Sequence, residues 1–195
     1  TDNVELYVLP SLAATLQKIA PGIDVSVVAP PPDWPMALQR GDIDLKLGRR
    51  YPVAGPLESQ VLSREHYGCV VRGGHPAPGR LTLKQYAQLD HLLVAPTAGP
   101  TTEPLGYVDA VLEKHGLRRR IVMTVPHFLV APFIVASSDF VLTAPLRLLD
   151  AFVKRLRLRR VELPVKLSGY ELSQVWAARS TRDDAHQWLR GAVQS

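Results

Sequence analysis

Cysteine is almost absent from this sequence, because Cys69 is the single one among 195 residues. One cysteine cannot form a disulfide within the chain, which fits a reducing compartment. Cys69 stands in the apolar run "YGCVV", so we expect a small core residue rather than a nucleophile. No apolar run approaches the roughly 20 residues that a membrane span needs, and residues 1–3 lack the basic start of a secretory signal. Together these absences favour a cytoplasmic protein.

The common catalytic and cofactor motifs are absent as well. The sequence holds no Walker loop, GxGxxG, HExxH, GxSxG or CxxC pattern. None of its six histidines pairs with another at metal-ligand spacing, so we expect no metal site. The acidic pairs Asp42/Asp44 and Asp183/Asp184 are explained by helix caps and first turns. We therefore expect no catalytic residues, no cofactor and no enzyme activity.

Positive charge is in excess, with a formal net charge of +5. Much of it lies in two clusters, "LRRR" at 117–120 and "KRLRLRR" at 154–160. Such clusters can bind nucleic acid or can form a solvated face. Few aromatic residues accompany them and no recognition helix is present, which favours the solvated face.

Apolar periodicity alternates between helical and strand spacing along the chain. Helical spacing from Val4 to Ile19 ends at Pro21-Gly22, and the alternating segment 23–29 predicts a strand. Further on, Gly41 and Thr82 stand at expected helix ends. Alternating strands and helices predict an α/β fold with a mainly parallel sheet and right-handed crossovers.

The order of these elements suggests two α/β subdomains joined by two crossovers. We expect residues 1–71 plus 166–195 to form the first subdomain and residues 72–165 to form the second. Strand ends and helix N-termini would then face a ligand cleft between them.

Six segments, in order over essentially the whole chain, resemble the effector-binding domain of LysR-type transcriptional regulators. They read "LPSLAATLQKIAPGIDVSVV", "LQRGDIDLKLG", "REHYGCVVRGGHP", "TLKQYAQLDHLLVAP", "LRRRIVMTVPHFLVAPFIVASSDFVLTAPLRLL" and "LSQVWAARSTRDDAHQWLRGAV".

The resemblance implies a type II periplasmic-binding-protein-like fold that binds a small organic effector. It also implies a homodimer or tetramer, and contact with promoter DNA through an N-terminal winged helix-turn-helix domain that this chain does not contain. The residues that would complete the first strand before Thr1 are also missing from this sequence. Two alternatives remain at this point, a solute-binding protein of the same fold and an enzyme built on it.

The stretch "DIDLKLGRR" departs from the family pattern, because Lys46 stands where a small or apolar residue is usual. An unpaired lysine inside a covered sheet is costly, so Lys46 must reach water, a carboxylate or the cleft. One hypothesis is that its side chain reaches water at a sheet edge or pairs with Asp44 or Glu58. The other is that Lys46 and Arg49 form a positive wall for an anionic effector.

Other effector contacts are expected at corners where a strand leads into a helix or where the first helix begins. The complete set of expected effector-binding residues is Thr1, Asp2, Asn3, Lys46, Gly48, Arg49, Pro96, Thr97, Ala98, Gly99, Pro126, His127, Phe128, Thr143 and Ala144. Phe128 could stack on a ring, and His127 could donate to a carboxylate.

The first helix and the segment that follows it offer more apolar surface than one subdomain buries. The resemblance implies that this edge packs against a second copy of the chain. The expected dimer-interface residues are Leu9, Leu12, Leu16, Val25 and Val27.

Overall fold

The structure is a computed structural model that describes residues 1–53, 55–96 and 107–194, and it divides into two compact units. Unit 1 consists of Thr1–Arg64 and Tyr170–Ser195, and unit 2 of Glu65–Gly169. The chain therefore passes between the units twice. The first crossing lies before the expected boundary at residue 71, because strand β3 pairs within the sheet of unit 2. The second lies a few residues after the expected boundary at residue 166.

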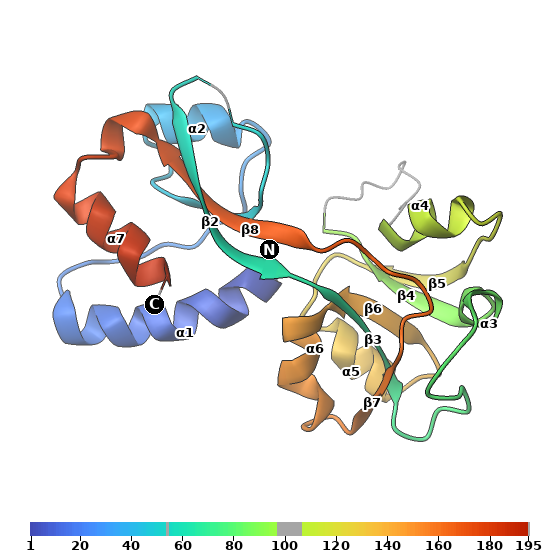
Figure 1. The fold of residues 1–195 in the computed structure, drawn as a ribbon. Coiled ribbons are helices and arrows are strands. Elements are labelled where there is room, and N and C mark those ends of the chain that lie inside the picture. The colour runs from blue at the N-terminus through green and yellow to red at the C-terminus, as the bar shows by residue number, and fades with distance from the viewer. Residues whose placement is uncertain (54, 97–106, 195) are drawn as a thin grey trace. The chain divides into compact units, whose positions relative to one another are not determined.

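Unit 1 is a three-stranded sheet with helices on both faces (Figure 1). The strand order is β1-β8-β2, and β1 runs antiparallel to β8. Its elements are α1 (Asp2–Ile19), α2 (Trp34–Arg40), β1 (Lys46–Arg49), β2 (Leu57–Glu65), β8 (Tyr170–Ala177), a 3₁₀ turn (Ala178–Ser180) and α7 (Asp184–Gln194).

Two small apolar clusters pack helices against the two faces of this sheet. On one face, Val8 of α1 and Val193 of α7 pack with Leu172 of β8. On the other, Leu38 of α2 packs with Val175 of β8. Leu172 and Val175 differ by an odd number of positions, so strand alternation places them on opposite faces.

The expected strand at 23–29 does not form. These residues pair with no strand in the described part of the chain, and Ile23, Val25, Val27 and Val28 are exposed. Alternation predicts only that a segment can be half-buried, whereas a strand also needs a neighbouring edge to bond its backbone. The prediction of a strand here was wrong.

Unit 2 is a five-stranded mixed sheet of order β5-β4-β6-β3-β7. The elements are β3 (Tyr67–Arg72), α3 (Leu83–Ala87), β4 (Asp90–Val94), α4 (Tyr107–Glu113), β5 (Arg120–Val125), α5 (Ala131–Ala136), β6 (Val141–Pro145), α6 (Leu146–Val153) and β7 (Leu158–Val161). Strands β4, β5 and β6 are parallel, but β3 runs antiparallel to both β6 and β7. The expectation of mainly parallel sheets is thus corrected, because the described pairings include both kinds.

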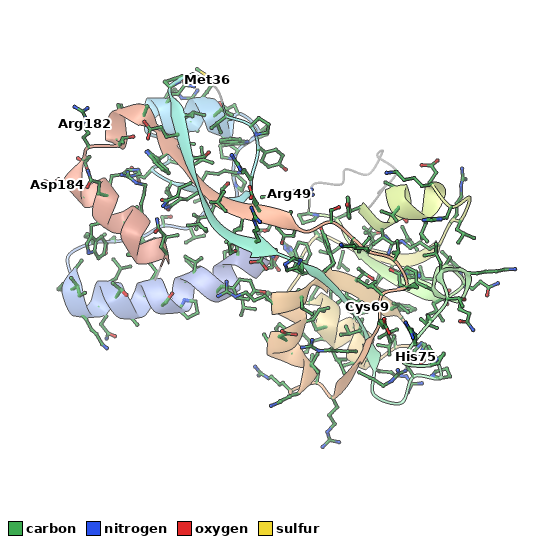
Figure 2. The ribbon with its side chains drawn as sticks, viewed as in Figure 1. Met36, Arg49, Cys69, His75, Arg182 and Asp184 are labelled. Carbon is green, nitrogen blue, oxygen red and sulfur yellow. The ribbon has the colours of Figure 1, made fainter. Side chains whose placement is uncertain are left out.

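Helices α3 and α4 cover one face of this sheet, and α5 and α6 cover the other (Figure 1). Cys69 lies in the α3/α4 core at 3% exposure (Figure 2), and burial raises the pKa of its thiol to about 12. The buried thiol is therefore protonated at neutral pH, as expected for a core residue.

Local sequence signals fix several helix ends as expected. The Thr82 side chain accepts from the backbone N–H of Gln85, whose own side chain accepts from the N–H of Thr82, which completes a capping box. Gly41 ends α2 in the left-handed region, with φ of 87°. Within the described residues, no helix is long and apolar enough to cross a membrane.

His91 is a buried titratable group in the core of unit 2. Its side chain is 0% exposed, its Nε2 bonds the Tyr86 carbonyl at 2.8 Å, and its ring meets the Tyr86 ring edge-on. Burial lowers the pKa of His91 from 6.5 to about 4.

Acidification is therefore expected to destabilise unit 2 through His91. The unfolded chain binds a proton there below about pH 6.5, whereas the folded chain binds it only near pH 4. This contribution is fully present above pH 6.5 and is lost as the pH falls, by about 3 kcal/mol at pH 4. Urea unfolding at pH 7 and pH 4 should show a much smaller difference for His91→Gln. The exposed His115→Gln serves as control, and equal pH dependence in both variants would contradict the role of His91.

Candidate functional site

Lys46 is buried, and it has no acidic partner among the residues that the structure describes. Its side chain is 9% exposed, and its Nζ lies 4.5 Å from the centre of the Trp34 ring and 4.8 Å from that of Tyr51. Neither Asp44 nor Glu58 forms an ion pair with it, so the hypothesis of a carboxylate partner is not supported. Two aromatic faces stabilise the cation instead, while burial still lowers the pKa of Lys46.

Lys46 and Arg49 do not form one wall. Lys46 lies opposite Val175 and faces α2, whereas Leu47 packs toward α1 and α7. Arg49 is three positions after Lys46 and therefore belongs to the face of Leu47. Arg49 is labelled in Figure 2. Its guanidinium lies 5.5 Å from the ring centre of Tyr170.

A small polar pocket of about 380 Å³ lies at the end of β1 and is lined by Arg49, Arg50, Pro52, Tyr170 and Glu171. Glu171 bonds Arg50 at 2.6 Å and approaches Arg64 at 3.4 Å. These arginines, with Arg50 first, lower the pKa of Glu171. One carboxylate thus neutralises two of the cations that an anionic ligand would need.

A larger apolar groove of about 600 Å³ also lies within unit 1. Val8 of α1, Leu47 of β1 and Leu189 of α7 line it, together with Val25 and Val27 of the segment that forms no strand. Its chemistry suits an apolar occupant.

The expected residues at the start of α1 are partly structural. Asp2 and Asn3 lie inside the helix rather than before it. Asn3 is 4% exposed and accepts a hydrogen bond from the Thr1 hydroxyl at 2.7 Å. Thr1 remains exposed at the groove, whereas Asn3 is held in the fold.

In unit 2, the parallel strands β4 and β5 end side by side, with Val94 opposite Val125. Pro96 and Pro126 therefore lie just beyond the carboxyl ends of the neighbouring strands β4 and β5, at the same end of the sheet. Pro96, Pro126 and His127 are exposed there, while Phe128 is half-buried.

Thr143 and Ala144 serve the sheet itself. The Thr143 hydroxyl bonds the Tyr86 hydroxyl at 2.7 Å, and Ala144 is 1% exposed opposite Gly68. The expected contacts Thr97, Ala98 and Gly99 lie outside the described residues.

The residues expected at a dimer interface fall into two groups. Leu12 is buried, and Leu9 and Leu16 pack against the core of unit 1. Val25 and Val27 are 43% and 50% exposed.

The basic clusters are engaged within unit 2. Arg119 is buried and forms a two-pronged ion pair with Asp109, with bonds of 2.7 and 2.8 Å. Arg159 donates to the backbone of His75 and Ala77, and Arg160 pairs with Asp150. These contacts use part of each cluster within unit 2. Among the described residues, no group of His, Cys, Asp and Glu could hold a metal ion.

Comparison with known proteins places these units in context. The family model described as "LysR substrate binding domain" matches residues 1–195. The HTH-type transcriptional activator NagR of a Ralstonia species is 32% identical over 193 residues, covering 97% of this chain and 62% of that protein. This chain thus spans about three fifths of the length of such relatives.

Solved structures of transcriptional regulators also match this chain. The probable transcriptional regulator PA0477 from Pseudomonas aeruginosa has a TM-score of 0.86 at 31% identity, covering 100% of this chain and 63% of that one. The regulatory domain of MexT, a transcriptional activator of the same organism, has a TM-score of 0.80 at 29% identity, covering 99% and 92%. The fold is accordingly of the type II periplasmic-binding-protein-like class.

Sequence reasoning missed the residues that surround Lys46. Trp34 and Tyr51 come from separate parts of unit 1, and no spacing in the sequence links them to Lys46. The only available signal was a single lysine in an otherwise apolar strand. It marked Lys46 as unusual but did not indicate which residues contact it.

Glu171→Gln is expected to strengthen the binding of small anions at the end of β1. The change frees Arg50 and Arg64 from their shared carboxylate, so the local potential becomes more positive. Titration with acetate at low salt should show a severalfold gain in affinity that added salt removes. Glu5→Gln is a control in α1, and an equal gain there would contradict a local effect.

Proposed function

This chain belongs to the LysR substrate-binding domain family, and on that premise we propose that it is the effector-sensing part of a DNA-binding transcriptional regulator. The match of the family model over the whole chain carries this proposal. The relatives named above are a transcriptional activator and a regulatory domain of one. Regulators of this family are not a class of enzyme, and we propose that this chain has no catalytic activity.

Two compact units connected by two crossings are suited to sensing. A ligand that binds one arrangement of the units better than another shifts the population toward it. We propose that this shift is the signal, and that the effector is a small organic molecule.

The partners follow from the same proposal. Promoter DNA would be bound by a part of the regulator outside residues 1–195, and we propose that the protein acts in the cytoplasm. A second copy of the chain would dock on the exposed segment at 23–28. A solute-binding role has less support, because the relatives named above are regulators.

A thermal-shift screen of the 195-residue chain tests the sensing role. A library of small acids, amides and amines should contain ligands that raise the melting temperature selectively. A ligand at 100 times its dissociation constant adds about 2.7 kcal/mol to the free energy of unfolding. A library without a single selective ligand would contradict effector sensing.

Self-association is tested by Val27→Asp. Val27 is 50% exposed in the apolar segment, so a charge there should weaken a dimer without disturbing the core. Sedimentation across a concentration series should show more monomer than for the parent chain. Val61→Asp, at a residue 40% exposed on β2, is the matched control. An unchanged dimer in Val27→Asp would exclude this surface.

A further inference from the structure

Ser173 is an unpartnered buried hydroxyl in the central strand of unit 1. Its side chain is 1% exposed, and its Oγ has no hydrogen-bond partner among the described residues. Burying a hydroxyl in this way is unfavourable, because its hydrogen bonds to water are lost without replacement. A buried hydroxyl without a hydrogen-bond partner therefore requires an explanation.

The strand register places Ser173 beside Lys46. On β1 and β8, Gly48 lies directly opposite Ser173, and Lys46 lies opposite Val175. Paired residues share a face and alternate residues repeat it, so Lys46, Gly48 and Ser173 all project toward the α2 side.

Because Gly48 has no side chain, the Lys46 ammonium can lie over its backbone, on the face that Ser173 shares. A Cβ at Gly48 would meet only Lys46 within 4 Å, with Nζ at 3.4 Å and Cε at 3.8 Å. The Lys46 side chain thus bends over Gly48, and Cβ atoms of directly opposed residues lie about 5 Å apart. One small group beside Gly48 could therefore reach both Nζ and the Ser173 hydroxyl.

The Lys46 ammonium has hydrogen-bonding capacity to spare. Its contacts in the described residues are the rings of Trp34 and Tyr51, which stabilise charge but are weak acceptors. No carboxylate or carbonyl oxygen among those residues accepts from Nζ. Two donors, one charged and one neutral, are accordingly left without an acceptor on the same face.

We propose that Lys46, Gly48 and Ser173 form a notch that binds the carboxylate of a small organic acid. One carboxylate oxygen accepts from the Lys46 ammonium and the other from the Ser173 hydroxyl, which satisfies both donors. A monoanion matches the single cation.

The notch names a ligand class for the sensing function proposed above, and its biological role rests on that function. The binding itself does not, because it can be measured on the chain alone. A carboxylate in the notch would also explain why a lysine occurs in an apolar strand. A buried cation is stabilised most when its hydrogen-bond donors have acceptors.

Calorimetric titration of the 195-residue chain with acetate and benzoate tests the proposal. The neutral acetamide and benzamide should not bind, because they lack the charge that Lys46 recognises. Lys46→Met should weaken carboxylate binding by tenfold or more, and Ser173→Ala by roughly tenfold, as for hydrogen bonds to charged groups. Lys18→Met and Ser11→Ala, both in α1, remove the same groups elsewhere and should leave affinity unchanged.

Ser173→Ala also separates binding from folding. Removing an unsatisfied hydroxyl should leave the melting temperature of the free chain unchanged or raise it, while the carboxylate-induced shift falls. A hydroxyl with a purely structural role would instead lower the melting temperature and spare the affinity. Gly48→Ala keeps the charge but fills the space, so it should weaken binding as well.

Two outcomes would overturn the notch. Carboxylate binding that survives both Lys46→Met and Ser173→Ala would place the ligand elsewhere and leave the sensing function intact. A parent chain that binds neither carboxylate would reject the ligand class. The library screen with amides and amines then decides the sensing function separately.

Discussion

Side-chain alternation along β1 and β8 is the constraint on which the candidate site of unit 1 depends. Leucines on one face pack against α1 and α7, so the residues between them must face α2. The Lys46 side chain therefore lies on the α2 face of the sheet, where its ammonium contacts the rings of Trp34 and Tyr51. The same alternation sends Arg49 to the opposite face, which divides a cation cluster that is continuous in the sequence.

Several arginines in the described part of the chain form local ion pairs. Arg119 is buried against Asp109, and Arg50 shares Glu171 with Arg64. Breaking a buried pair leaves an uncompensated charge, so such arginines serve the fold before any partner. Lys46 differs because aromatic rings, rather than a carboxylate, surround its ammonium. Part of the positive charge in the sequence is thus used within the fold, whereas the role of Lys46 in binding is our proposal.

Much of the architecture could be predicted from the sequence, because local signals agreed with tertiary packing. The capping box at Thr82 and the left-handed cap at Gly41 need only a few neighbouring residues, and both are present. The prediction of a strand at 23–29 was wrong because the local signal and the tertiary packing disagreed. Its alternating valines are compatible with a strand, but pairing requires an edge that local sequence does not supply. The antiparallel setting of β3 likewise depends on partners far along the chain.

The sequence by itself determined most of the element order and indicated the α/β class and the family, since periodicity, helix caps and ordered motifs are all local features of the chain. It also marked Lys46 as exceptional. Only the tertiary structure decided what surrounds that lysine, because strand register brings Gly48 opposite Ser173 across 125 positions of the chain. Register is set by packing of whole faces and not by local preference, so the partners of a buried polar group become visible only once the sheet is assembled.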